Sequence, residues 1–333
     1  MNETYALHTI PQLHLRRFGF GPKNQGIWVY DKHKDLIFPG TVRSSSVRPD
    51  YYRVARASGE AECGLERELF QKAETIAAPH LAKLLSLQQG ERPFDPMARF
   101  HLAHYLAIQR ARVPAMIKRA EEAAVFQGKT LEDLRLEWLT LFRSGELEIR
   151  PPKGFALVHV LDLALKTQPQ AFFDMAWEIR EATAPPWLVL GEEPVVAVMP
   201  PGTPADEEQG FRTPGIEIVI PLSPERLLVM HDGRTADVVV VNAPLRSAGS
   251  DDWVRGANLA SWRSASLHVW DREKADLEPH RKEAMVGTRL PHRCCRAEPR
   301  THVLGHARAT SCNGLVRSGR SKPPRARQAR RHV

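Results

Sequence analysis

The chain has 333 residues, of which 42% are hydrophobic and 26% are charged, and its formal net charge is +8. This composition is typical of globular proteins and excludes collagen-like, membrane-embedded and wholly disordered chains. No stretch approaches the roughly 20 apolar residues that span a bilayer. Residues 1–5 show neither the basic nor the apolar region of a secretory signal. We therefore expect a soluble cytoplasmic protein that makes no membrane contact.

The first elements predicted along the chain are a short helix and a β-hairpin. Pro11 can begin a helix, and the spacing that follows puts Leu15 and Phe18 on one side of it. Between residues 27 and 38, two β-branched and aromatic runs flank a polar connection of five residues, which predicts a hairpin. We expect the Pro-Gly pair at 39–40 to end its second strand.

The middle of the chain has the apolar spacing of helices. Residues 63–86 read as one amphipathic helix that is interrupted near Pro79. Residues 100–110 are apolar nearly all round, which indicates a helix buried at the centre. Further helices are predicted at 113–127, 130–143, 155–166 and 169–182.

After residue 186 the pattern changes to short β-rich runs separated by Pro, Gly and Asp. These runs predict a mostly antiparallel C-terminal sheet, with strands at 187–190, 194–198, 216–220, 227–230 and 238–241. The connection at about 200–214 is expected to be the most mobile one. A helix near 250–262 and a strand at 266–270 close the domain. The predicted fold class is therefore α+β, with an N-terminal β-hairpin segment, a central helical bundle and this sheet.

Residues 286–333 form a basic tail. They hold eleven arginines and one lysine against a single acid, Glu298, which leaves 35 basic and 38 acidic residues in 1–285. Without aromatic residues or an apolar period, the tail buries too little surface to offset a chain entropy of about 1–2 kcal/mol per residue. We expect one α+β domain over 1–285 and a disordered Arg-rich tail, which makes at most a weak contact with nucleic acid. A frameshift-derived extension is the alternative origin of the tail.

Several motifs, taken in order, resemble a mostly bacterial family catalogued as domain of unknown function 4238. The resemblance covers about residues 8–272 and rests on His8, Pro11, Leu15, Phe18, the Trp28–Lys32 strand, Tyr51-Tyr52, the 65–66 helix, Leu106–Arg110, Arg112–Pro114, Pro194–Val196, Ile220–Pro224 and Asn258. Where the family usually has Thr or Ser and then Asp, this chain has Gly191-Glu192-Glu193. The family label implies a shared fold and carries no activity.

His8 is the most suggestive single residue, because an imidazole can act as a general base near neutral pH. Arg16 and Arg17 follow a few residues on and can hold an anionic ligand. The alternative is architectural: His8 satisfies a backbone carbonyl and orders the N-terminal segment.

Arg110 and Glu193 complete the candidate site. Arg110 either faces the carboxyl end of its helix, where a cation gains about 0.3–1 kcal/mol, or clamps a phosphate or carboxylate. Glu193, at a turn, is a candidate catalytic carboxylate, although turns also hold acids because they are solvated. Since residues two apart point to different sides of a helix, at most one of Arg110 and Arg112 lines any given pocket.

Histidine and cysteine spacings give no metal site. His101 and His104 share one face of a helix, but no third ligand follows from spacing. Cys63 is the single cysteine of 1–285, which agrees with a reducing cytoplasm. The sequence predicts no metal and identifies no cofactor, ligand or partner.

Two functions from different classes remain. The default is a non-catalytic binding or interaction module whose distinctive residues are architectural. The alternative is a hydrolase or nuclease-like enzyme that acts on a phosphate-bearing substrate, with His8 as general base and Arg16, Arg17 or Arg110 as anion holders. Whether the protein is an enzyme stays open at this point.

Overall fold

The computed structural model describes residues 6–49, 51, 54–55, 61–62, 65–88, 91, 94–119, 153–200, 211, 213–232, 246–248 and 251–285. All of these residues fall within one compact unit, Met1–Arg296. Several predictions lie outside the described residues, namely the helix at 130–143, the strand at 238–241, most of the 200–214 connection and the tail at 286–333.

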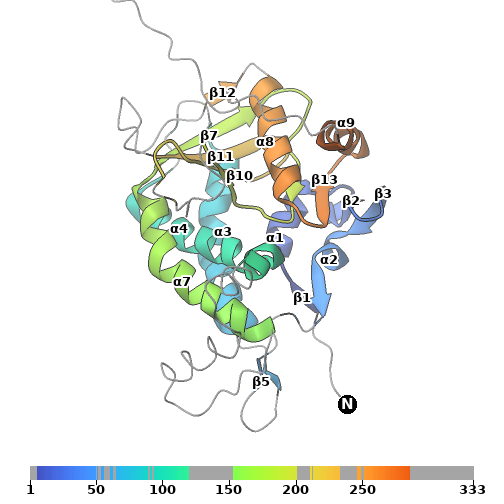
Figure 1. Ribbon diagram of the computed structural model, residues 1–333. Helices are drawn as coiled ribbons and strands as arrows, with labels where there is room; N and C mark the ends of the chain where they lie inside the picture. Colours follow the sequence, from blue (N-terminus) through green and yellow to red (C-terminus); the bar gives the residue numbers. More distant parts are fainter. Residues whose placement is uncertain are drawn as a thin grey trace, which may run out of the picture. The chain divides into compact units, whose positions relative to one another are not determined.

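A five-stranded sheet forms the centre of this unit (Figure 1). Its strand order is β12-β7-β11-β10-β9, and every pairing is antiparallel except the parallel pair β12 and β7. The strands are β7 (Ala176–Ala182), β9 (Val196–Val198), β10 (Glu217–Pro221), β11 (Arg226–His231) and β12 (Arg246–Ala248). The predicted α+β class with a mostly antiparallel sheet is therefore confirmed.

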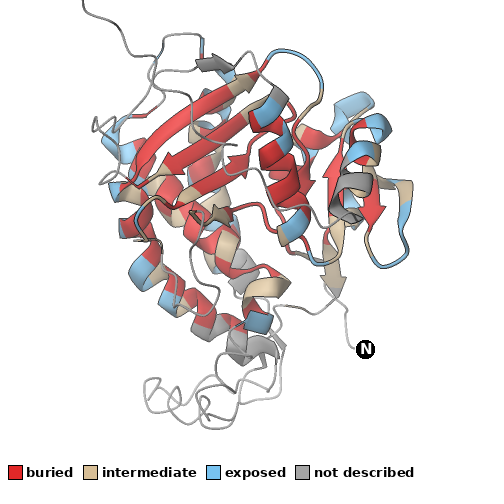
Figure 2. Cartoon of the chain, turned by 45° about the horizontal axis from the view of Figure 1, so that its top comes forward, coloured by how far each residue is buried: buried red, intermediate tan, exposed pale blue. Residues whose placement is uncertain are grey.

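Helices cover both faces of this sheet. Because side chains alternate along a strand, Ile218 and Ile220 of β10 pack with α3 (Gln71–Ser86) and α4 (Pro96–Ala111), whereas Val219 packs with α8 (Asp251–Ser264) on the other face. The strands are buried between these layers (Figure 2).

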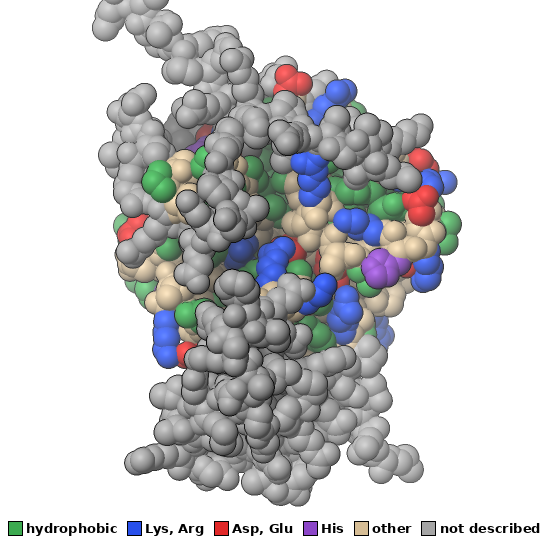
Figure 3. All heavy atoms as spheres, in the orientation of Figure 1, with side chains coloured by type: hydrophobic (Ala, Val, Ile, Leu, Met, Phe, Trp, Pro, Cys, Tyr) green, Lys and Arg blue, Asp and Glu red, His purple; other side chains and the backbone are tan. Residues whose placement is uncertain are grey.

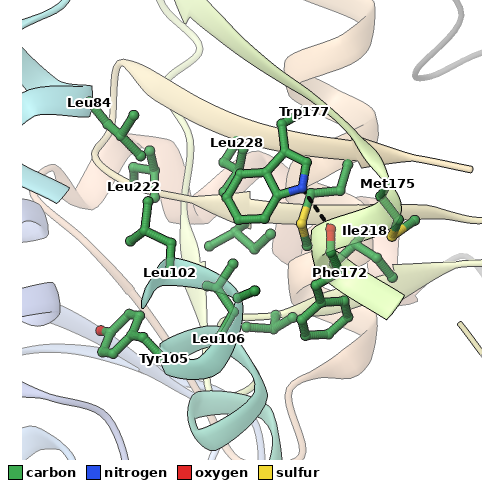
Figure 4. Packing of buried hydrophobic residues seen from close by; sticks show 14 of the residues in the cluster. Leu84, Leu102, Tyr105, Leu106, Phe172, Met175, Trp177, Ile218, Leu222 and Leu228 are labelled. Atoms are coloured by element: carbon green, nitrogen blue, oxygen red, sulfur yellow. Dashed lines mark hydrogen bonds between the residues drawn. The ribbon is translucent and has the colours of Figure 1, made fainter. Parts of the chain in front are cut away.

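The largest core cluster lies between the sheet and α4 (Figure 4). Trp177 is fully buried, and its indole Nε1 donates a hydrogen bond to the carbonyl of Phe172 at 2.7 Å, which satisfies its polar atom. The helix α7 (Lys153–Asp174) carries Phe172 and packs along α4.

The helix α4 is the predicted central helix, and local signals fix its start. Asp95 caps it by accepting a hydrogen bond from the backbone N–H of Ala98 at 2.7 Å, and Pro96 occupies the first turn. Ten of its residues are buried, which agrees with the nearly all-round apolar pattern.

A second sheet, with strand order β3-β2-β13-β8, joins the two ends of the unit. The predicted hairpin is confirmed as β2 (Gly26–Asp31) and β3 (Leu36–Thr41), and β2 pairs with β13 (His268–Asp271), which in turn pairs with β8 (Leu190–Gly191). The expectation that residues 39–40 end the hairpin is wrong, because β3 runs on to Thr41. Because β3 is an edge strand of this sheet, it is a position where a strand tolerates a proline such as Pro39.

The N-terminal segment is tied to both sheets. The strand β1 (Ala6–His8) pairs with β4 (Val47–Pro49), and the predicted helix begins after Pro11 as α1 (Gln12–Leu15) followed by the 3-10 turn η1 (Arg16–Phe18). Leu15 and Phe18 are fully buried, as the spacing predicts. His14 Nε2 lies 2.7 Å from the carbonyl of Pro221 at the end of β10.

Two helix predictions are wrong in part. The helix at 169–182 ends at Asp174, and 176–182 forms β7, since Trp177 and Ile179 alternate into the core. The helix α3 is not interrupted near Pro79, which lies inside it. Remaining elements are η2 (Pro22–Asn24), α2 (Val42–Ser45), β5 (Val54–Ala55), β6 (Ala61–Glu62), the π-helix η3 (Leu65–Phe70) and α9 (Lys274–Met285).

Candidate functional site

A pocket of about 330 Å³ lies between the N-terminal segment and the four-stranded sheet. Residues far apart in the sequence line it: Thr9, Ser45, Ser46, Val47, Arg48, Tyr51, Glu192, Leu267, His268 and Trp270. The set combines three serine or threonine hydroxyls, one ion pair and three aromatic or imidazole rings, so several polar groups converge on one pocket.

Glu192 organises one wall of the pocket. It follows β8, whose Gly191 packs so closely against the carbonyl of Ser261 in α8 that a side chain there would clash. The Glu192 carboxylate is 2% exposed and accepts hydrogen bonds from the Ser266 hydroxyl at 2.6 Å, the backbone N–H of Leu267 at 2.9 Å and Arg48 Nη2 at 2.7 Å. The three donors offset the cost of burying this charged carboxylate, and the ion pair holds Arg48 at the pocket.

The strand β13, which pairs with β8, supplies the neighbouring part of the lining. His268 and Trp270 are two residues apart, so both lie on one side of the strand. Trp270 is 1% exposed, and its indole Nε1 has no hydrogen-bond partner among the described residues. Burial lowers the pKa of His268 below its usual value, so its ring is neutral at pH 7. The lining therefore includes a neutral imidazole and a tryptophan whose buried N–H has no partner among the described residues.

His8 lies behind the pocket wall and not on it. Its Nε2 accepts a hydrogen bond from the amide of Gln12 at 2.8 Å, which puts the ring proton on Nδ1, 3.3 Å from Ser46 Oγ. The Ser46 hydroxyl in turn donates to the carbonyl of Ile10 at 3.0 Å. Burial, reinforced by Arg112 and Arg43, lowers the pKa of His8. Both ring nitrogens therefore hold the N-terminal segment together in the neutral state.

The adjacent residues Arg16 and Arg17 have opposite environments. Arg16 is exposed and donates from Nη2 to Gln12 Oε1 at 3.0 Å, which extends the hydrogen-bond chain that begins at Ser46. Arg17 is half-buried, and its Nη1 is buried without a hydrogen-bond partner among the described residues. Neither residue lines the pocket.

Arg110 and Glu193, far apart in the sequence, are brought together beside Arg119. The buried Glu193 carboxylate accepts two hydrogen bonds from Arg119, at 3.0 and 3.3 Å. Burial raises the pKa of Glu193, and the two arginines oppose this rise. Arg110 donates to the carbonyl of Val195 at 3.2 Å, and burial lowers its pKa to about 10. This cluster lies next to Glu192 in sequence but does not line the pocket.

The five predicted site residues therefore do not converge on the pocket.

Figure 3 shows that, on one face, Lys and Arg side chains gather near the middle of the described surface. None of the residues that line the pocket was predicted from the sequence as a site residue, and Arg48, His268 and Trp270 are among those missed. Period-two spacing on the predicted strand 266–270 links His268 with Trp270, but nothing local points to Arg48.

The described part of the chain contains no group of three His, Cys, Asp or Glu side chains placed to hold a metal ion. His101 Nδ1 lies 2.9 Å from His80 Nε2, and His104 bonds the carbonyl of Phe100 in its own helix. Within the same residues, no helix is long and apolar enough to cross a membrane.

Fold and pocket together define an α+β protein with a small polar pocket between its N-terminal segment and a four-stranded sheet. The chain belongs to the family described as Protein of unknown function (DUF4238), whose model matches residues 8–274, and the resemblance in sequence is confirmed. No curated protein and no solved structure matches the chain.

Proposed function

We propose that the protein is a non-catalytic binding module that holds a small polar molecule in the pocket between β4, β8 and β13. One observation carries the proposal. Trp270 lines the pocket, and its buried Nε1 has no hydrogen-bond partner among the described residues. Because a buried donor without a partner costs about 1–3 kcal/mol, an acceptor on a bound ligand would recover that free energy.

The lining residues indicate the chemistry of this ligand. A guanidinium carries five N–H donors, and the bond to Glu192 uses one nitrogen of Arg48. The hydroxyls of Thr9 and Ser46 already donate to backbone carbonyls, so towards a ligand they offer oxygen acceptors. A flat molecule satisfies these groups if it has carbonyl or carboxylate oxygens that accept from Arg48, and N–H or O–H groups that donate to Thr9 and Ser46.

The proposal is favoured over a hydrolase acting on a phosphate-bearing substrate by the state of His8. A general base needs a nitrogen that can take a proton from the substrate or water. His8 Nε2 already accepts a hydrogen bond from Gln12, and Nδ1 faces Ser46. Neither nitrogen faces the pocket, since His8 is not among its lining residues.

The proposal includes a cytoplasmic location and leaves any nucleic-acid contact to the tail. A single cysteine in residues 1–285 supports the location, since disulfide frameworks mark oxidising compartments. The excess positive charge of 286–333 supports an electrostatic contact with nucleic acid there.

The test is recovery of a small molecule with the full chain. The purified protein is unfolded, and the released molecules are identified by mass spectrometry. Ser45→Phe fills the pocket, and Ser44→Phe adds the same ring at an exposed neighbour that does not line it. We expect the molecule with the wild type and Ser44→Phe and its loss with Ser45→Phe. Equal recovery from all three variants would refute the proposal.

A further inference from the structure

A pair of histidines lies where α3 packs against α4, outside the pocket (Figure 1). His80 comes from α3 and His101 from α4, and His80 Nε2 lies 2.9 Å from His101 Nδ1. Their ring centroids are 5.1 Å apart. The sequence groups His101 with His104, one turn further along the same helix, and its spacing does not reveal the imidazole that α3 supplies.

The separation of the two facing nitrogens suits a shared metal ion. A histidine nitrogen binds Zn²⁺ at about 2.0–2.1 Å, so two such nitrogens on one ion lie roughly 3 Å apart at tetrahedral or octahedral angles. The 2.9 Å between His80 Nε2 and His101 Nδ1 is close to that value. An ion can therefore replace the proton between the rings after a small rotation of each ring.

The pair is accessible from solvent, because both rings are only half-buried. On its other side, the His101 ring meets the half-exposed ring of Phe100 edge on, with the centroids 5.9 Å apart. Burial, and then the neighbouring His101, lower the pKa of His80, so its ring is neutral at pH 7. A neutral imidazole can move its proton to the other ring nitrogen and leave a lone pair for a metal ion.

We propose that His80 and His101 form a binding site for a divalent transition-metal ion of the class that includes Zn²⁺, Ni²⁺ and Cu²⁺. Imidazole is a ligand that suits these ions, whereas Mg²⁺ prefers oxygen. Since no group of three metal-ligating side chains occurs in the described part of the chain, two imidazoles and water molecules would complete the coordination. The bound ion joins α3 to α4. Neither histidine lines the pocket, so the site is independent of the proposed function.

The test is a thermal-shift titration of the full chain with zinc chloride, against magnesium chloride at equal ionic strength. An ion that binds the folded state and joins two helices raises the melting temperature with its concentration. We expect a rise with zinc and none with magnesium. Equilibrium dialysis then counts the zinc ions bound to each variant.

Three substitutions separate metal binding from the hydrogen bond between the rings. The amide of His80→Gln reaches the position of Nε2, and that of His101→Asn reaches the position of Nδ1. Each amide can keep a hydrogen bond to the other histidine but removes the metal-binding nitrogen. His104→Asn is the matched control on α4, where His104 Nδ1 bonds the carbonyl of Phe100 at 2.9 Å.

We expect at least tenfold weaker zinc binding at this site, and one bound zinc ion fewer, with His80→Gln and with His101→Asn. His104→Asn should bind zinc as the wild type does. Zinc held by cysteines elsewhere in the chain is common to all variants and cancels from the comparison.

Each outcome decides the proposal. No zinc-specific rise in the wild type overturns it and leaves the pair as a hydrogen bond between two helices. A zinc response kept by both His80→Gln and His101→Asn, or lost equally with His104→Asn, overturns it as well. If His80→Gln fails to fold, His101→Asn decides: a lost zinc response with an unchanged melting temperature in magnesium supports the site, and a retained response refutes it.

Discussion

Replacement of His8 tests whether this residue is architectural. Among the described residues, the imidazole forms hydrogen bonds with Gln12 and Ser46, and the Ser46 hydroxyl donates to the carbonyl of Ile10. A hydrogen bond contributes about 0.5–1.5 kcal/mol net, so the loss of both costs about 1–3 kcal/mol in His8→Ala. Such a loss lowers the melting temperature by roughly 2–4 °C per kcal/mol in domains of 150–250 residues, and by less in a larger one.

Two further variants divide this cost between the ring nitrogens. The amide of His8→Asn reaches the position of Nδ1 and keeps the contact with Ser46, whereas that of His8→Gln reaches the position of Nε2 and keeps the contact with Gln12. We expect each to lose about half of the free energy that His8→Ala loses, measured by urea unfolding of the full chain.

The stability that His8 contributes should also depend on pH. Burial lowers the pKa of His8 below 6.5, so the folded protein binds this proton less readily than the unfolded chain. The stability from His8 is complete above pH 6.5 and is lost as the pH falls below it. The free-energy difference between wild type and His8→Gln therefore shrinks on acidification. An unchanged melting temperature in His8→Ala would refute the architectural role.

Three other titratable groups give predictions of the same kind. Burial lowers the pKa of His14 to about 3, so wild-type stability falls from pH 6.5 towards that value, and His14→Gln removes this slope in acid unfolding. Burial raises the pKa of Asp271 well above its usual value, which disfavours its charged form at pH 7. We therefore expect Asp271→Asn to raise the midpoint of urea unfolding at pH 7. An unchanged or lower midpoint would contradict this. Burial acts to lower the pKa of His231, but hydrogen bonds with Glu178 and Glu217 outweigh it and raise the pKa. The destabilisation by His231→Gln should be full below pH 6.5 and shrink as the pH rises through the raised pKa, and equal destabilisation at all pH values would contradict this.

A helix or strand can be predicted from the sequence where the spacing of its apolar residues matches the residues that it buries. The spacing of Leu15 and Phe18, the hairpin at 27–38 and the apolar helix around Leu106 all carry such signals, and each is confirmed. The strand β7 was missed because a charged alternation such as Glu178-Ile179-Arg180 fits an amphipathic helix as well as a strand.

Partnerships between distant segments are absent from any local pattern. The hairpin strand β2 pairs with β13, more than two hundred residues later, and β13 contributes His268 and Trp270 to the pocket that Thr9 also lines. The roles predicted for His8, Arg16, Arg17, Arg110 and Glu193 stay predictions. The sequence pattern behind them is His and Arg near apolar motifs. This pattern does not distinguish a side chain that bonds within the protein from one that binds a substrate.

The most direct test of the binding account is the mass of the small molecule released from the full chain before and after prolonged incubation at neutral pH. The account predicts one species, absent from Ser45→Phe and unchanged by incubation with the wild type. A new product mass that forms with the wild type but not with His8→Gln would contradict it.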